Sequence, residues 1–178
     1  MTRHELFPTP VWHIEGTPQP LIDELYQAAY RFKEKNSSDN RSNQGGYQTP
    51  AFDWEDFHPQ CKECIENTLS EHIKHPIEVM SWWYNISPKG AWNTPHNHAG
   101  VDLALVLYVT ESDGLLIFMN PNSMRKIDNQ FHGGAGDHVG IQAKKGDIVI
   151  FPSDLLHYVL PNPREEDRIS ISMNLQLS

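Results

Sequence analysis

Apolar and polar residues alternate with a period of two from residue 77 to the end of the chain, and this pattern limits the possible folds more than any other feature. Such alternation is typical of strands that bury one face. Turn-forming Pro, Gly, Asn and Asp residues divide the stretch into short runs. The predicted strands are Ile77–Ser87, Val101–Thr110, Leu115–Asn120, Val139–Ala143, Asp147–Phe151, Leu155–Leu160 and Arg168–Leu177. A series of short strands of this kind predicts a sandwich or a barrel.

The first 76 residues are mainly helical in their spacing. Phe7–Ile14 is predicted to be a short edge strand, because its two prolines cannot donate to a central ladder. One helix is predicted to begin at Thr17-Pro18 and to end in a basic turn, and a second to span Asp53–His75. Pro59 lies near the start of the second helix and is able to split off a short initial piece. Asn36–Gln48, rich in Asn, Ser and Gly, is predicted to be a loop.

Length and composition fit one domain with its own core. The chain has 178 residues, of which 38% are hydrophobic and 21% charged. We expect residues 1–76 to supply the N-terminal strand and the supporting helices, and residues 77–178 to form the β core. The protein is therefore expected to be mainly β, with helices packed on one face of the strands.

The charge balance and the cysteines exclude several classes of function. Asp and Glu outnumber Lys and Arg by 23 to 14, with no basic block, so nucleic acid is not an expected partner. The two cysteines allow no disulfide framework, and Cys61-x-x-Cys64 at helical spacing is predicted to be a pair of packed thiols rather than half of a zinc site. The N-terminus lacks a signal-peptide pattern and no apolar run is long enough for a bilayer, which predicts a cytoplasmic protein without membrane contact.

The last two predicted strands carry polar side chains where a β core would bury apolar ones. In the strand from Arg168 to Leu177 the alternation is strict, so one face is apolar and the other carries Arg168, Ser170, Ser172, Asn174 and Gln176. The preceding strand holds His157 in an apolar stretch. If the Pro161–Pro163 turn folds it back onto the last strand, His157 lies opposite Arg168. A buried polar face must line a cavity or be fully hydrogen-bonded.

A histidine pair at spacing two supplies the remaining part of a candidate site. His96 and His98 project from the same face of an extended chain, as ligands of one metal ion must. Imidazoles from two separate strands can hold Fe(II) and leave coordination positions open. The guanidinium of Arg168, two residues before Ser170, suits a dicarboxylate because it donates two parallel hydrogen bonds.

These motifs, in this order, resemble the Fe(II)/2-oxoglutarate-dependent oxygenases, and more narrowly a small prolyl-hydroxylase-like family of unassigned substrate. The matching segments run along nearly the whole chain and are weakest over Asn122–His138. They are Leu6-Phe7-Pro8-Thr9-Pro10-Val11, Gly90-Ala91-Trp92-Asn93, Pro95-His96-Asn97-His98, Val106-Leu107-Tyr108-Val109, Gly114-Leu115-Leu116-Ile117-Phe118, Lys145-Gly146-Asp147-Ile148-Val149-Ile150-Phe151-Pro152-Ser153, His157, and Arg168-Ile169-Ser170-Ile171-Ser172-Met173-Asn174. The resemblance implies a double-stranded β-helix, the jelly roll of cupin-like proteins.

The resemblance also implies a role for each site residue. His157 would be the distal iron ligand and His96 the first. Arg168, with Ser170, would bind the far carboxylate of 2-oxoglutarate, and Tyr108 would lie against this co-substrate, with Asn93 lining the same pocket.

The chain departs from the wider superfamily at the third iron ligand. That superfamily has Asp or Glu two residues after the first histidine, where this chain has His98. Three alternatives are open: His98 itself, a carboxylate from elsewhere such as Asp102, or a water or anion. We favour His98.

The predicted activity is that of a dioxygenase that consumes O₂ and 2-oxoglutarate, releases succinate and CO₂, and hydroxylates a protein side chain or a small molecule. Two alternatives are a cupin-like metalloenzyme that does not use 2-oxoglutarate and a catalytically inactive jelly-roll binding protein. The Gly-rich stretch His132–His138 is a candidate lid over the pocket. A homodimer is one option for the assembly.

Overall fold

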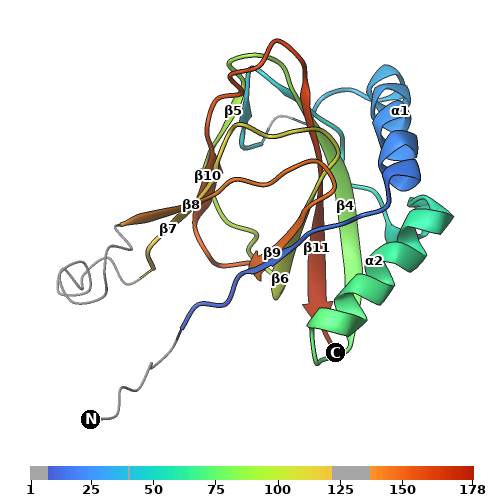
Figure 1. The fold of residues 1–178 in the computed structure, drawn as a ribbon, viewed down its shortest axis with the longest axis vertical. Helices are drawn as coiled ribbons and strands as arrows, with labels where there is room; N and C mark the ends of the chain where they lie inside the picture. The colour runs from blue at the N-terminus through green and yellow to red at the C-terminus, as the bar shows by residue number, and fades with distance from the viewer. Residues whose placement is uncertain (1–7, 40, 122–136) are drawn as a thin grey trace.

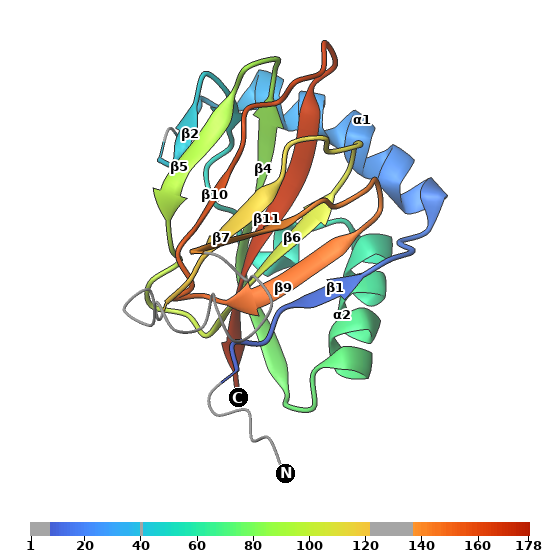
Figure 2. The same ribbon diagram turned by 60° about the vertical axis from the view of Figure 1, so that its left-hand side comes forward.

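Two antiparallel sheets face each other in the structure, a computed structural model that describes residues 8–39, 41–121 and 137–178. The larger sheet has the strand order β1-β9-β6-β11-β4-β3, and the smaller one β2-β5-β10-β7-β8 (Figures 1 and 2). The strands are β1 Trp12–Ile14, β2 Asn43–Gln44, β3 Tyr47–Gln48, β4 Ile77–Ser87, β5 Trp92–His96, β6 Leu103–Tyr108, β7 Leu116–Met119, β8 His138–Ile141, β9 Ile148–Pro152, β10 His157–Val159 and β11 Arg168–Leu177. The helices are α1 Gln19–Lys35, the short 3₁₀ helix η1 Trp54–Asp56 and α2 Pro59–His72.

The order in which the chain visits the two sheets confirms the predicted double-stranded β-helix. From β4 to β11, every step moves to the other sheet except the step from β7 to β8, which pair as neighbours. The last strand, β11, closes the larger sheet between β4 and β6. That the whole chain forms one domain stays a prediction.

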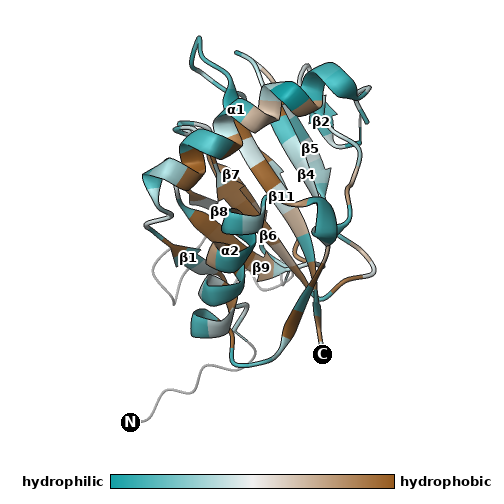
Figure 3. Ribbon diagram, turned by 90° about the vertical axis from the view of Figure 1, so that its right-hand side faces the viewer, coloured by the Kyte–Doolittle hydropathy of each residue, from teal (hydrophilic) through white to brown (hydrophobic). Residues whose placement is uncertain are grey.

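Both helices cover the outer face of the larger sheet (Figure 3). Apolar residues at helical spacing bury one side of each helix, including Ile22 and Leu25 of α1 and Ile65 and Leu69 of α2. They pack against apolar side chains of the sheet, of which Trp82 is fully buried. No helix in the described ranges is both long and apolar enough to span a bilayer.

The larger sheet is apolar on both of its faces in the part where β9 runs. Ile148 and Ile150 contact the core beneath the helices, whereas Val149 and Phe151 belong to a second core between the two sheets. This parity follows from the alternation of side chains along a strand. The second core does not fill the space between the sheets, and the polar face of β11 borders what is left.

Several predicted boundaries were wrong, and Pro and Gly explain most of the differences. Pro59 occupies the first turn of α2 and splits the predicted second helix into η1 and α2, as its position indicated, whereas the helix ends at His72 rather than at the predicted His75. The predicted loop Asn36–Gln48 contains β2 and β3, a tight connection in which Gly45 adopts φ +70°. The chain around His96 is a regular strand, β5, that the alternation pattern did not predict as one.

The predicted hairpin between the last two strands was also wrong. His157 pairs with His96 of β5 and with Phe118 of β7, while Arg168 lies opposite Ser87 of β4. The connection between β10 and β11 therefore crosses from one sheet to the other. Asn162 holds this crossing, because its side-chain Nδ2 donates to the backbone oxygens of Ser87 at 2.9 Å and Glu166 at 2.8 Å.

Candidate metal centre

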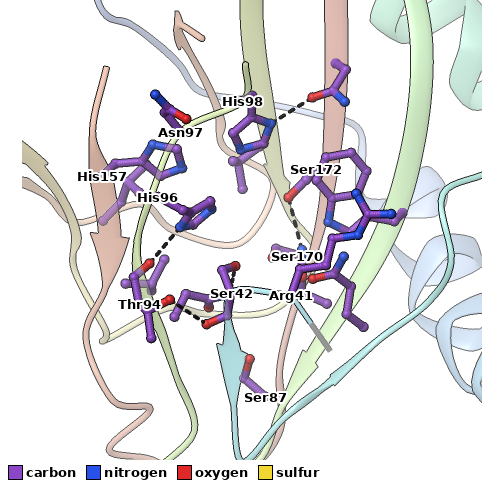
Figure 4. A pocket seen from close by; sticks show the side chains of 18 of the residues that line it. Arg41, Ser42, Ser87, Thr94, His96, Asn97, His98, His157, Ser170 and Ser172 are labelled. Atoms are coloured by element: carbon purple, nitrogen blue, oxygen red, sulfur yellow. Dashed lines mark hydrogen bonds between the residues drawn. The ribbon is translucent and has the colours of Figure 1, made fainter. Parts of the chain in front are cut away.

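Three histidines converge at the open end of the space between the sheets (Figure 4). His96 ends β5, His157 begins β10, and the two are direct partners across the ladder, with ring centroids 4.3 Å apart. His98 follows two residues later, and its ring lies 5.3 Å from that of His157 and 5.5 Å from that of His96. One ligand nitrogen from each ring lies within 4.8 Å of the other two. The three side chains therefore lie together, through a strand pairing other than the predicted one, and their role as metal ligands stays a prediction.

Each imidazole uses Nδ1 in a hydrogen bond to an oxygen. Nδ1 of His96 is 2.7 Å from the Thr94 carbonyl, Nδ1 of His157 is 2.9 Å from the Leu155 carbonyl, and Nδ1 of His98 is 2.7 Å from Oδ1 of Asn174. Because these oxygens only accept, Nδ1 carries the proton in each neutral ring. The lone pair then lies on Nε2, which is the tautomer that metal-binding histidines need.

The site favours uncharged imidazoles. Burial, and secondarily the positive charge of a protonated His96, lower the pKa of His157 to about 3. Burial also lowers the pKa of His96 and of His98. Three neutral rings with free lone pairs and no charge of their own are a suitable donor set for a divalent transition metal.

Asp102, the alternative third ligand, lies away from the histidines. Its carboxylate is exposed and accepts hydrogen bonds from the Leu177 backbone at 2.8 Å and from the Gln176 side chain. It belongs neither to the histidine cluster nor to the lining of the adjoining pocket. The structure thus brings together His96, His98 and His157 and leaves Asp102 on the surface beside β11.

A cavity of about 410 Å³ adjoins the histidines, and the other predicted site residues line it. These are Arg168, Ser170, Tyr108 and Asn93. Ser170 is the direct cross-strand partner of Tyr108, which places both side chains on the same inner face of the larger sheet. Asn93 reaches the pocket from β5, the strand that ends in His96.

Arg168 is a buried cation without an anion. It is 4% exposed, and burial lowers its pKa. Its Nη1 donates to the Leu160 carbonyl at 2.9 Å and its Nη2 to the Ala91 carbonyl at 3.4 Å, and no described carboxylate forms an ion pair with it. A buried guanidinium normally pairs with an acid, so this one fits a ligand that brings a carboxylate into the cavity.

Several pocket residues were not assigned to the site from the sequence, and Trp83, Asn174 and Arg41 are three of them. Trp83 stacks on the ring of His98 at 5.6 Å between centroids, and Asn174 bonds to the same ring. Asn174 shares the polar face of β11 with Arg168, so the strict alternation of that strand could have identified it. Arg41 reaches the mouth of the pocket from the segment before β2, where the sequence gives no periodic signal.

Two weaker sequence features contribute nothing to this site. Cys61 is buried between α2 and the larger sheet, and within the described chain neither Cys61 nor Cys64 joins a metal-binding cluster. The predicted lid over His132–His138 lies outside the described residues, apart from its last two.

The sequence was compared with models of protein families and with curated proteins, and the fold with solved structures. The model of a family described as "Putative 2OG-Fe(II) oxygenase" matches residues 81–174, which is more than half of the chain. A search of curated protein sequences gave no match.

The fold is similar to that of a prolyl-4-hydroxylase from Pseudomonas putida, with 15% identity, a TM-score of 0.66 and coverage of 94% of this chain and 92% of the other. SnoN, a non-haem α-ketoglutarate-dependent epimerase of nogalamycin biosynthesis, gives 14% identity, a TM-score of 0.71 and coverage of 94% and 78%. HygX from Streptomyces hygroscopicus, solved with nickel and 2-oxoglutarate bound, gives 12% identity, a TM-score of 0.66 and coverage of 94% of this chain and 83% of the other.

Proposed function

Because the chain belongs to the 2OG-Fe(II) oxygenase family, we propose that it is a dioxygenase whose iron is held by His96, His98 and His157 and whose 2-oxoglutarate is bound by Arg168. It is an enzyme of the 2-oxoglutarate-dependent class, with Fe(II) as its metal and O₂ and 2-oxoglutarate as co-substrates. The observation that supports the proposed ligand set is that one ring nitrogen of each histidine lies within 4.8 Å of the other two, while the Nδ1 atom of every ring already has a hydrogen-bond partner.

His98 takes the place of the usual carboxylate ligand in this proposal. Its ring is fixed on two sides, by the stacked indole of Trp83 and by the amide of Asn174. Asp102 would have to leave two hydrogen bonds on β11 and enter the pocket from the surface. These contacts support the proposal that the third ligand is His98.

The co-substrate would occupy the cavity between the iron site and Arg168. A guanidinium has five N–H donors, and the two printed carbonyl contacts leave others to bind the far carboxylate of 2-oxoglutarate. Ser170 and the hydroxyl of Tyr108 lie on the same inner face and are placed to donate to the same ligand. Burial raises the pKa of Tyr108, so its hydroxyl keeps its proton and remains a donor.

The protein's contribution to the reaction would be orientation and exclusion of water. Iron bound at this site supplies the activation of O₂ that couples decarboxylation of 2-oxoglutarate to oxidation of a substrate C–H bond. The three imidazoles would hold the metal and Arg168 would set the direction of the co-substrate, while the apolar core between the sheets closes the inner side of the site. We propose hydroxylation as the outcome, on a protein side chain or a small molecule.

The second candidate function is a cupin-like metalloenzyme that does not use 2-oxoglutarate, and the three-histidine cluster favours it. That function gives Arg168 no ligand, although the chain buries this residue at the far end of the same cavity. Since burying an unpaired cation is costly, we favour the function that uses it.

The two candidates are separated by anaerobic titration of the protein with Mn(II) and then with 2-oxoglutarate, followed by thermal unfolding. We expect a rise in melting temperature with the metal and a further rise with 2-oxoglutarate. His157→Ala should remove both rises, and Arg168→Gln only the second, while His72→Ala, on the exposed end of α2, should change neither. A metal-dependent rise without a 2-oxoglutarate effect would favour the second function.

A further inference from the structure

The pocket is positively charged although the protein is acidic. The chain carries a formal net charge of −9, yet the described residues that line the cavity include two arginines and no Asp or Glu. Arg168 is buried, whereas the Arg41 side chain, labelled in Figure 4, is 73% exposed, which places Arg41 on the solvent side, at the mouth of the pocket. A positive concave site in an acidic protein attracts anions and repels cations.

Under the proposed function, the loaded pocket keeps this positive charge. The two charges of Fe(II) and the two of 2-oxoglutarate cancel, and three neutral imidazoles add none. A carboxylate ligand would have offset the charge of Arg168, but His98 stands in its place. Because a net charge in a partly buried site is unfavourable, an anionic group on the substrate would stabilise the ternary complex.

Arg41 is held at the mouth by the strand that carries His96. The neighbouring residue, Ser42, accepts a hydrogen bond from the Thr94 amide at 2.9 Å through its carbonyl and from Nδ2 of Asn93 at 3.1 Å through its hydroxyl. The Arg41 guanidinium bonds to Asp39 through Nε alone, at 2.9 Å, and Asp39 is not among the residues that line the pocket. Within the described chain its two terminal nitrogens have no acceptor, so a carboxylate can bind to both in parallel.

We propose that the substrate of this enzyme bears a carboxylate and that Arg41 binds this group at the mouth of the pocket. The carboxylate belongs either to a small acid or to an acidic side chain of a peptide. Arg41 is then the specificity-determining residue, and it acts on substrate binding rather than on the metal or the co-substrate.

The test uses matched acid and amide probes with the full-length protein under anaerobic conditions. The protein is loaded with substoichiometric Mn(II) and saturating 2-oxoglutarate, so that the Arg168 site is filled. The small-molecule pair is N-acetylglycine and N-acetylglycinamide; the peptide pair is acetyl-Gly-Asp-Gly-amide and acetyl-Gly-Asn-Gly-amide. Enhanced relaxation of the probe protons by Mn(II) reports binding near the metal and gives the affinity of each probe.

We expect the acid of at least one pair to bind at least about fivefold more tightly than its amide, a preference that salt weakens because Arg41 is largely exposed. Arg41→Gln should remove the preference while leaving Mn(II) and 2-oxoglutarate binding unchanged. Arg164→Gln, a control that removes an arginine paired with Asp113 and Glu166 and absent from the pocket lining, should keep it.

Equal relaxation by acid and amide in both pairs, or a preference that survives Arg41→Gln, would overturn the inference. Failure of the protein to bind Mn(II) or 2-oxoglutarate would instead count against the proposed function. A preference within the N-acetylglycine pair would indicate a small acid as the substrate, and a preference within the peptide pair would indicate an acidic peptide.

Discussion

Replacing Gly114 by alanine tests whether the position of Arg168 determines co-substrate binding. A Cβ at residue 114 would lie 2.2 Å from Nη1 of Arg168 and 3.0 Å from the Leu160 carbonyl. The first distance is far inside van der Waals contact, so the guanidinium must move. Its bond from Nη1 to the Leu160 carbonyl, now 2.9 Å, is the first that it would lose. Gly114 is thus required for space rather than for backbone freedom.

The cost follows from the kind of bond that breaks. A hydrogen bond to a charged group contributes about 2 kcal/mol, so we expect the free energy of unfolding to fall by about that amount. For a chain of this length the corresponding fall in melting temperature is about 4–8 °C. A displaced guanidinium also no longer meets the far carboxylate of 2-oxoglutarate, and we expect its affinity to fall by about tenfold or more.

The assay is calorimetric titration of 2-oxoglutarate into the Mn(II)-loaded protein, with thermal unfolding of the same samples. Gly140→Ala is the matched control, because a Cβ there would approach only side-chain ends, Cδ1 of Ile117 at 3.0 Å and Cδ1 of Leu115 at 3.2 Å. We expect the control to keep the wild-type affinity. Wild-type 2-oxoglutarate affinity in Gly114→Ala would refute the role assigned to Arg168.

Three further outcomes are expected. Asn174→Leu should weaken Mn(II) binding by about 10- to 100-fold, because His98 loses the acceptor that fixes its tautomer. The control Asn85→Leu, which breaks only the side-chain bond to Ser172, should leave Mn(II) binding unchanged. Equal losses of affinity in the two variants would refute the role assigned to Asn174. Asp102→Asn should retain metal-dependent succinate release, and a folded variant without turnover would show that the third ligand was wrongly assigned. The metal-free protein should be most stable above pH 6.5. As the pH falls below 6.5, the free energy of unfolding should decrease by about 1.4 kcal/mol per pH unit for each histidine of lowered pKa, because the unfolded chain takes up protons that the folded histidines do not; for His157 this continues down to its folded-state pKa of about 3. Urea midpoints that do not change with pH would contradict this.

The last strand shows how much local pattern can determine. From Arg168 to Leu177 the predicted and observed bounds coincide. As far as Leu175, the apolar residues belong to the core beneath the helices and the polar ones line the cavity. A strand has a period of two whatever its neighbours are, so the sequence alone assigns each side chain to a face. The same reasoning placed His96 and His98 on one side of an extended segment.

The alternation of side chains could not predict which strands pair with each other. The Pro161–Pro163 segment was expected to form a hairpin, but it carries the chain from the smaller sheet to the larger one. A turn sequence specifies a change of direction, not the sheet that the next strand joins. One of the two contacts through which Asn162 fixes the crossing is with Ser87, which lies far away in the sequence. The short strand β2, which brings Arg41 to the pocket, likewise exists only because β5 offers it a partner.

Residue type and strand period are local properties, so they were enough to predict which residues could carry the chemistry and toward which face most of their side chains point. Only the folded chain shows that His157 pairs with His96 rather than with Arg168, that Asp102 lies outside the site, and that Arg41 lines the pocket. The physical reason is that a metal centre is defined by distances of a few ångströms between segments sixty residues apart, and those distances are set by the closure of two sheets around a shared core.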